Sequence, residues 1–358
     1  MGFFRRLRPR LALIGFVLLA AALVAYFVGV VSTALILAVT FTPRASQWTE
    51  NLLWYSGVPA LLGLVMMILG LLRVPTGYLR ASSFPAVNSI PTGPVTVVLT
   101  AYNDETSISS AVADFLSAPG VASVVVVDNN SSDRTASWAA EAGAEVVVEQ
   151  RPGYGWCVYR CLVEGLQRSP EGIVVLCEGD RTFRAFDIAK LIAYLPHADI
   201  VNGTRTTAQL VSHETQLTPL MHYGNLIAGK LFDLKYPGRA TITDLGTTYK
   251  AIRSASLPQL LATVDPNVNL EFNAHLLDEA IHQHLAVVEV PITFWPRVGK
   301  SKGGNVNNRR ALKVGVAMVR GMLFGWKRSQ THSKLATEVA LFEALTTAPL
   351  PEFQPDSR

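Results

Sequence analysis

The N-terminal part of the chain carries two long runs of apolar residues. Residues 11–41 contain no charged side chain, and residues 52–72 form a second uncharged run after a short polar stretch. A helix needs about 20 apolar residues to cross a bilayer, so both runs are long enough to span one. A cleaved signal peptide would have a shorter apolar region and no second run behind it. The pattern predicts two transmembrane helices, paired as a hairpin, over residues 11–73.

The arginines around these runs predict the orientation of the hairpin. Arg44 lies between the runs, and Arg73 and Arg80 follow the second run. Four arginines precede the first run: Arg5, Arg6, Arg8 and Arg10. Because positive residues favour the cytoplasmic side, we expect a basic cytoplasmic N-terminus at residues 1–10 and a cytoplasmic catalytic domain. The chain is then expected to be a multi-pass protein of the plasma membrane, with a linker over residues 74–94.

From residue 95 onward, short β-branched runs alternate with amphipathic stretches. The runs are apolar on both faces, which predicts buried parallel strands over 95–100, 121–127, 145–148 and 173–177. The stretches between and after them predict helices over 105–117, 133–143, 155–168 and 185–195. This alternation is typical of an α/β domain with an open, mostly parallel sheet. We assign it to residues 95–304.

Polar residues follow each predicted strand. The four clusters are Ala101–Glu105, Asp128–Thr135, Arg151–Gly155 and Glu178–Asp180. One such cluster alone has the composition of an ordinary loop or helix cap. Four of them at the carboxyl edge of one parallel sheet predict a ligand site, because ligands bind beyond that edge. Neither a G-x-G-x-x-G motif nor a P-loop motif is present, which disfavours a dinucleotide site and excludes a P-loop ATPase.

The last cluster contains two carboxylates two residues apart, Glu178 and Asp180. Paired carboxylate oxygens are suitable ligands for a hard divalent cation. We therefore expect Mg²⁺ or Mn²⁺ as a cofactor, with Glu178 and Asp180 as its protein ligands. Such a cation neutralises a leaving diphosphate, which is the chemistry that a nucleotide sugar requires.

Charge and cysteine content narrow the classes of partner. The formal net charge is +4, and residues 297–328 contain basic residues but no Asp or Glu. A basic zone on a chain with apolar anchors favours contact with anionic lipid headgroups or phosphates. Nucleic acid is not expected as a partner, because the middle of the chain has no interleaved basic and aromatic pattern. The three cysteines show no disulfide pattern, as is usual in a reducing cytosol.

Residues 305–328 have the pattern of an amphipathic helix. Basic residues recur on one face at Arg309, Lys313 and Arg320. Apolar residues occupy another face: Leu312, Val316, Val319 and Leu323. The unbroken basic run favours a helix that lies on the membrane surface over one that packs in a core. Residues 329–358 are expected to form a C-terminal helix and a disordered tail.

The order and spacing of several short motifs resemble family 2 glycosyltransferases with a GT-A fold. The similarity covers about residues 94–303 and extends to the group of dolichol- and polyprenyl-phosphate sugar synthases. The matching stretches are VVLTAYNDE, VVVVDNNSSDRT, RPGYGWC, VLCEGD, IVNGTR, TDLGTTYKAI, NLEFN and VEVPITFWPRVGKSK. The family has Asp at the first position of its D-x-D motif, where this chain has Glu178.

The resemblance implies roles for particular residues of this sequence. The donor would be bound by Ala101, Tyr102, Asp104, Glu105, Asp128, Asn130, Gly155, Glu178, Gly179 and Asp180. Candidate catalytic residues are Asp180, Asp244 and Glu271. The acceptor or its phosphate would contact Arg205, Thr247, Arg297, Lys300 and Lys302. The basic, glycine-rich loop at 297–304 is expected either to close over a phosphate or to touch lipid headgroups.

These features predict an inverting transfer of a sugar from a GDP- or UDP-linked donor to a polyprenyl phosphate at the cytoplasmic membrane face. A lipid phosphate is already largely ionised at neutral pH and needs no base. Transfer to a hydroxyl of a lipid-linked glycan is the alternative within the enzyme class, with Asp244 or Glu271 as the base. A catalytically silent membrane scaffold is the alternative outside it. A homo-oligomer is possible under each of these three interpretations.

Overall fold

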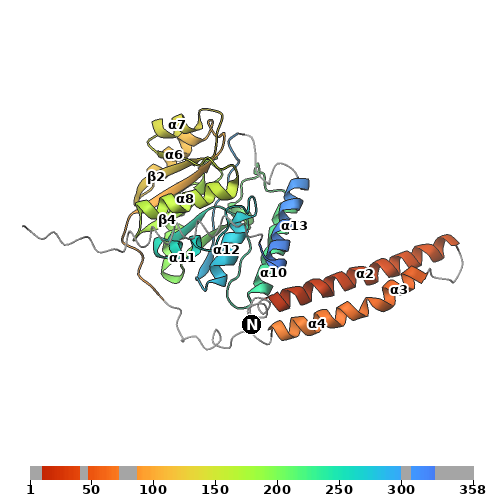
Figure 1. The fold of residues 1–358 in the computed structure, drawn as a ribbon. Helices are drawn as coiled ribbons and strands as arrows, with labels where there is room; N and C mark the ends of the chain where they lie inside the picture. Colours follow the sequence, from red (N-terminus) through yellow and green to blue (C-terminus); the bar gives the residue numbers. More distant parts are fainter. Residues whose placement is uncertain (1–9, 41–46, 72–86, 300–307, 327–358) are drawn as a thin grey trace, which may run out of the picture.

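The computed structural model describes residues 10–40, 47–71, 87–299 and 308–326. In these residues, a pair of apolar N-terminal helices projects from a domain in which helices flank one sheet (Figure 1). The strands of the sheet are β1 (Val95–Ala101), β2 (Val121–Asp128), β3 (Glu145–Val148), β4 (Ile173–Glu178), β5 (Ile200–Thr204), β6 (Lys250–Arg253) and β7 (Val287–Pro291).

The strand order across the sheet is β3-β2-β1-β4-β6-β5-β7. Strand β6 is antiparallel to both of its neighbours, and every other pairing is parallel. The predicted mostly parallel α/β sheet is therefore confirmed. The four strands that the sequence predicts are present within one residue at each end.

Helices cover both faces of the sheet. One face carries α6 (Ile108–Leu116), α7 (Thr135–Glu141) and α9 (Ile188–Tyr194). The other carries α8 (Tyr154–Arg168), α10 (Pro219–Lys235), α11 (Leu257–Leu261), α12 (Phe272–His282) and α13 (Asn308–Phe324). Successive side chains of a strand point to opposite faces, so Val98 packs in one hydrophobic cluster and its neighbours Val97 and Leu99 in the other.

The predicted helices α6 and α7 begin two or three residues later than their sequence patterns suggest. Residues 103–105 instead form hydrogen bonds with the loop that follows β2. The backbone N–H of Asn103 donates to Ser131 Oγ at 2.8 Å, and that of Asp104 donates to Thr135 Oγ1 at 2.7 Å. These contacts between segments that are distant in the sequence, and not local helix propensity, therefore set where the two helices begin.

The N-terminal helices form the predicted pair. Helix α2 (Leu11–Thr40) packs along α4 (Gly57–Leu71), which follows the short helix α3 (Gln47–Tyr55). Glycines allow the close approach: a Cβ built on Gly15 would lie 2.4 Å from the backbone nitrogen of Met67. Both Leu11–Thr40 and Gln47–Leu71 are long and apolar enough to cross a membrane.

The hairpin is joined to the main domain at its inner end. The side chain of Leu13, near the start of α2, is fully buried in the hydrophobic cluster that also contains α10, α12 and α13. Farther along α2 many apolar side chains are exposed, among them Leu23, Phe27 and Leu35. The helix thus begins in the core of the domain, and its later part exposes apolar side chains on the surface.

Several predictions fall on residues that the structure does not describe. They concern the basic residues Arg5, Arg6 and Arg8, the arginines Arg44, Arg73 and Arg80, the loop lysines Lys300 and Lys302, and the tail at 329–358.

Candidate active site

A cavity of about 1100 Å³ opens at the carboxyl edge of the sheet. Its polar end is formed by residues at or just after the carboxyl ends of β1, β2 and β4, including Tyr102, Asn130 and Glu178. The rest of the cavity runs between α10 and α13. Apolar side chains line that part, among them Leu220, Ile227, Val314, Met318 and Val319. A polar site and an apolar groove are thus parts of one continuous space.

The carboxylates Glu178 and Asp180 lie at the polar end, where β4 leaves the sheet. Gly179 between them packs closely on Ile108: a Cβ there would lie 2.5 Å from Ile108 Cδ1, so that side chain would have to shift. Asp180 is buried, and its Oδ1 accepts hydrogen bonds from the backbone N–H and the hydroxyl of Thr182. Burial, together with the neighbouring charge of Asp180, raises the pKa of Glu178 to about 7.

A chain of hydrogen bonds orients Glu178. The hydroxyl of Thr248 donates to Glu178 Oε1 at 2.5 Å and lies 2.5 Å from the hydroxyl of Tyr154. The amide of Asn273 donates to the Tyr154 hydroxyl at 2.8 Å. Tyr154 comes from α8 and Asn273 from α12, so three separate segments fix one carboxylate.

Arg297 bridges two carboxylates at the polar end. Its Nη2 donates to Asp104 Oδ1 at 2.9 Å, and its Nη1 lies 2.8 Å from Asp180 Oδ2. The side chain is mostly buried and lines the cavity. Arg297 therefore supplies positive charge where two carboxylates converge.

The carboxylate pair fits a divalent cation. Asp180 is buried and Glu178 is partly buried, and Arg297 is the cation paired with Asp180. The raised pKa of Glu178 shows that its negative charge is incompletely compensated, and the oxygens of both carboxylates suit Mg²⁺ or Mn²⁺. No cluster of three or more His, Cys, Asp or Glu side chains that could hold a metal is found in the described part of the chain. The remaining ligands would therefore be substrate phosphates and water, as is common for Mg²⁺.

The loop that follows β2 presents a buried carboxylate and a rigid turn. Oδ2 of Asp128 accepts a hydrogen bond from the backbone of Ser131 at 3.3 Å, while its Oδ1 has no hydrogen-bond partner among the described residues. The side chain of Asn129 is bonded to the backbone of Glu149, Arg151 and Gly153. An acceptor that is buried without a donor is costly in free energy. Asp128 does not itself line the cavity, so its role in donor binding stays a prediction.

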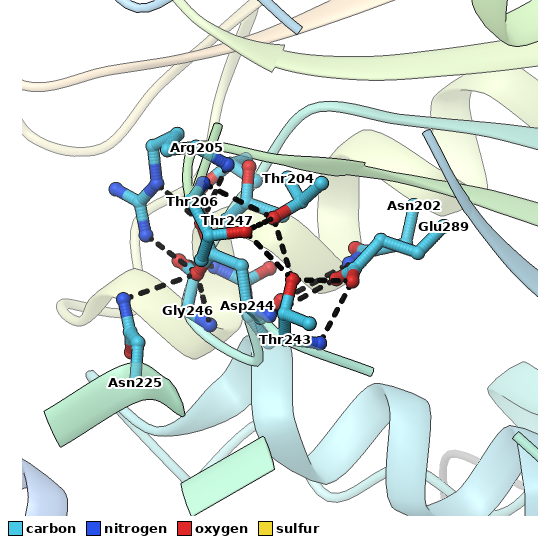
Figure 2. A network of polar contacts seen from close by, with 12 residues as sticks. Asn202, Thr204, Arg205, Thr206, Asn225, Thr243, Asp244, Gly246, Thr247 and Glu289 are labelled. Carbon is cyan, nitrogen blue, oxygen red and sulfur yellow. Dashed lines mark hydrogen bonds and ion pairs between the residues drawn. The ribbon is translucent and has the colours of Figure 1, made fainter. Parts of the chain in front are cut away.

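Arg205 and Asp244 form a buried bidentate ion pair beside the cavity (Figure 2). Arg205 Nε is 2.7 Å from Asp244 Oδ2, and Arg205 Nη2 is 2.8 Å from Oδ1. Asn225 of α10 and the backbone of Gly246 also donate to Asp244 Oδ1. Burial alone would raise the pKa of Asp244, but the charge and hydrogen bonds of Arg205 hold that pKa below its ordinary value.

A second carboxylate lies behind this pair. Glu289 of β7 accepts hydrogen bonds from the backbone and hydroxyl of Thr243 and from the backbone of Asp244 (Figure 2). Its Oε1 also accepts from Asn202 Nδ2 at 3.1 Å. Glu289 thus holds the segment that carries Asp244, which in turn holds the guanidinium of Arg205.

The predicted site residues divide into two groups. Those that line the cavity are Ala101, Tyr102, Asp104, Asn130, Glu178, Asp180, Arg205 and Arg297. Within the described part of the chain, the cavity lining does not include Glu105, Asp128, Gly155, Gly179, Asp244, Thr247 or Glu271. Of these, Asp244 contacts a lining residue directly, whereas Gly155 packs closely on the backbone of Pro266 and Val268.

Sequence reasoning missed several residues of the site. Tyr154 and Asn273 lie within motifs that carry the family resemblance, so their positions in RPGYGWC and NLEFN were the available signal. Glu289 lies within another such motif, VEVPITFWPRVGKSK, but nothing in that motif names its partner. The apolar wall from α10 carried no local signal. The partners of both are distant in the sequence: Glu289 and Thr243 are 46 residues apart.

The comparisons with known proteins agree with this geometry. The model of the family described as Glycosyl transferase family 2 matches residues 96–260. An uncharacterised glycosyltransferase of Mycobacterium tuberculosis is 34% identical over 210 residues, which cover 58% of this chain and 88% of that protein. The dolichyl-phosphate hexose transferase of Haloferax volcanii is 30% identical over 226 residues, which cover 61% of this chain and 92% of that protein.

Solved structures show the same fold. The glucosyl-3-phosphoglycerate synthase of Mycobacterium tuberculosis, in complex with phosphoglyceric acid, superposes with a TM-score of 0.50 at 19% identity. The match covers 66% of this chain and 82% of that one.

Proposed function

Since the chain belongs to glycosyl transferase family 2, we propose that it transfers a sugar from a nucleotide sugar to a polyprenyl phosphate, with inversion at the anomeric carbon. Family membership makes it a glycosyltransferase, and the scaffold alternative is set aside. The donor, the acceptor and the stereochemistry are the parts proposed here. The similarity to a dolichyl-phosphate hexose transferase supports the acceptor.

The observation that carries the proposal is the continuity of the cavity. Carboxylates and arginines occupy one end, and the apolar groove between α10 and α13 leads away from them. A polyprenyl phosphate has the same two parts, a charged head and a long apolar tail. A soluble sugar acceptor has no apolar tail that could fill the groove.

Arg205 is the proposed contact of the acceptor phosphate. The bidentate pair with Asp244 uses its Nε and Nη2 and leaves Nη1 for a ligand in the cavity. A guanidinium fork suits phosphate oxygens in geometry and charge. Asp244 is then a residue that orients Arg205, and Thr247 lies in the same segment.

The reaction requires one bond to form and one to break. An oxygen of the acceptor phosphate attacks the anomeric carbon while the bond from that carbon to the nucleoside diphosphate breaks on the opposite face. A divalent cation on Glu178 and Asp180 would neutralise the departing diphosphate. Arg297 adds positive charge beside the same carboxylates, and Asp104 fixes the guanidinium in place.

The geometry gives less support to transfer onto a glycan hydroxyl. Such a reaction needs a base, and the candidates were Asp244 and Glu271. Asp244 is held ionised by Arg205, with a lowered pKa that makes it a weak proton acceptor. Glu271 is absent from the cavity lining of the described residues.

We also propose that α2 and Gln47–Leu71 span the plasma membrane, with the catalytic domain in the cytoplasm. The length, hydropathy and exposed apolar side chains of both segments support a membrane location. In this arrangement, the exposed Leu220 and Ile227 of α10 and the exposed Val316 of α13 meet the lipid surface near the hairpin.

The test uses purified full-length protein, polyprenyl phosphate, Mg²⁺ or Mn²⁺, and a panel of radiolabelled GDP- and UDP-sugars. We expect label in the organic phase that is lost with EDTA and in Asp180→Asn. Glu145→Gln, an exposed carboxylate at the far end of the sheet, serves as the matched control and should retain activity. Nucleotide release that requires a glycan acceptor, with no label in lipid, would overturn the proposed acceptor.

A further inference from the structure

A buried carboxylate outside the polar site, Asp278 of α12, collects hydrogen bonds from two other helical segments. Lys235 Nζ lies 2.6 Å from Asp278 Oδ1 and 2.8 Å from Oδ2. The hydroxyl of Tyr236 donates to Oδ1 at 2.8 Å, and the indole N–H of Trp326 donates to Oδ2 at 2.6 Å. Each carboxylate oxygen of Asp278 therefore accepts hydrogen bonds from two donors.

These donors come from the ends of the two helices that enclose the apolar groove. Lys235 is the last residue of α10, and Trp326 lies two residues beyond Phe324, the last residue of α13. The two helices lie side by side next to the inner end of the hairpin (Figure 1). Asp278 thus joins both walls of the groove at one point, away from Glu178 and Asp180.

The contacts around Trp326 leave α13 little freedom at this end. The indole ring lies so close to α13 that a Cβ on Gly321 would be 2.5 Å from it, and it packs on the ring of His275 at 5.1 Å. The start of α2 reaches the same place: a Cβ on Gly325 would lie 3.6 Å from both terminal nitrogens of Arg10. A buried carboxylate that loses a partner cannot replace it with water, so these helix ends depend on one another.

We propose that Asp278 is a positioning residue that fixes α10 and α13 at the spacing a polyprenyl tail requires. The inference rests on the proposed function, because it names the tail as the occupant of the groove. Asp278 touches neither the carboxylate pair nor the arginines in any described contact. Replacing Asp278 is therefore expected to weaken the affinity for long acceptors and to leave the rate of the chemical step unchanged.

The test compares full-length wild type with Asp278→Asn and Trp326→Phe in lipid nanodiscs. Trp326→Phe keeps an aromatic ring and removes the indole N–H, so it guards against a folding failure of the first variant. Lys230→Met is the matched control, since Lys230 lies on the same helix with an exposed ion pair. Transfer is measured to undecaprenyl phosphate and to a short, water-soluble isoprenyl phosphate, alongside hydrogen exchange of the α10 and α13 amides.

In both test variants we expect KM for undecaprenyl phosphate to rise about tenfold, as when a binding-competent arrangement becomes a minor population. KM for the nucleotide sugar and turnover on the short acceptor should stay at wild-type values, while α13 amides exchange faster. A purely structural role would instead lower turnover on both acceptors equally, and that result overturns the proposal. Unchanged exchange in α13 with an unchanged KM also overturns it.

The proposed function and this inference fail in different ways. Wild-type protein that transfers sugar to neither isoprenyl phosphate overturns the proposed function. The exchange rates of α10 and α13 then decide by themselves whether Asp278 fixes the two helices.

Discussion

At the scale of single residues, the role of an ionised side chain depends on its partners. Asp244 looks in the sequence like a free carboxylate near the acceptor. In the structure its oxygens accept hydrogen bonds from Arg205, Asn225 and the backbone of Gly246. A carboxylate with this many donors is stabilised in its charged form and positions a guanidinium better than it takes a proton.

Replacing Arg205 by Lys tests this pairing. Lysine keeps the positive charge but cannot bind both oxygens of Asp244, so the cation loses its fixed orientation. We expect kcat/KM for the polyprenyl phosphate to fall roughly tenfold to hundredfold, the range for hydrogen bonds to charged groups. Steady-state kinetics should show an unchanged KM for the donor. Arg160→Lys, at a partly exposed arginine paired with Glu164 and outside the cavity lining, is the control, and an equal loss in both variants would contradict the assignment.

Lys250 shows what burial does to an amine. It lies on β6, fully buried, with its ammonium against the carbonyl of Thr247 and Asn273 Oδ1. Burial lowers the pKa of Lys250 to about 7, while the negative charge of Asp244 opposes the shift. Arg205 lowers the same pKa further, and Glu178 and Glu289 raise it.

This pKa predicts a dependence of stability on pH. Between about pH 7 and pH 10 the unfolded chain binds a proton that folded Lys250 does not, so stability should rise with pH by about 1 kcal/mol per pH unit. In Lys250→Met this contribution disappears. Thermal unfolding in detergent at pH 7 and pH 9.5 measures the difference. Lys230→Met, an exposed lysine, should keep the wild-type rise, and an identical rise in Lys250→Met would refute the prediction.

At the scale of elements, α10 and α13 create a space that neither helix has alone. Each contributes one glycine to the cavity lining, Gly224 on α10 and Gly315 on α13. A Cβ on either glycine would meet nothing within 4 Å. Both glycines cost helix propensity relative to alanine, so free space at both positions is consistent with a groove that a ligand fills.

Filling the groove from one wall should exclude a long acceptor. In Gly315→Leu the new side chain enters free space, so the fold is not strained and helix propensity improves. We expect KM for a long polyprenyl phosphate to rise about tenfold or more, because the side chain clashes with the tail. The thermal midpoint should not fall. Gly57→Leu, at another open glycine outside the cavity, is the control for acceptor kinetics.

At the scale of the whole molecule, the hairpin and the catalytic domain share a core. Leu13 of α2 is buried with residues of α10, α12 and α13, and Arg10 lies against the end of α13. The path of α2 is therefore set by the domain at its inner end and by α4 along its length. This arrangement holds the groove close to the apolar helices.

Substitution at the helix crossing tests this packing. A Cβ on Gly63 would lie 2.6 Å from the carbonyl oxygen of Gly15, so Gly63→Leu must separate α2 from α4. Overpacking of this kind costs about 1–3 kcal/mol, which corresponds to a fall of roughly 5 °C in the midpoint. The measurement is thermal unfolding of the full chain in detergent. Gly57→Leu on the same hairpin should leave the midpoint unchanged, and equal midpoints for both variants would argue against close packing.

The sequence by itself determined the elements whose signals are local. The continuous β-branched runs at 95–100 and 173–177 are typical of strands that are buried on both faces of a sheet, and the structure confirms them. The apolar runs likewise predicted the helix pair, and the motif order predicted the glycosyltransferase family, both of which are confirmed. The assigned roles of individual site residues stay predictions.

Only the tertiary structure decided which charges meet. Arg297 pairs with Asp104 across 193 residues, and the antiparallel insertion of β6 brings the segment around Asp244 to the carboxyl edge of a parallel sheet. The groove and the Asp278 junction arise in the same way, from helix ends that are distant in sequence. Hydrophobic periodicity is a property of neighbouring residues and can be read locally. An ion pair depends on a few ångströms between side chains, and that distance is fixed only when the whole sheet and its helices have packed.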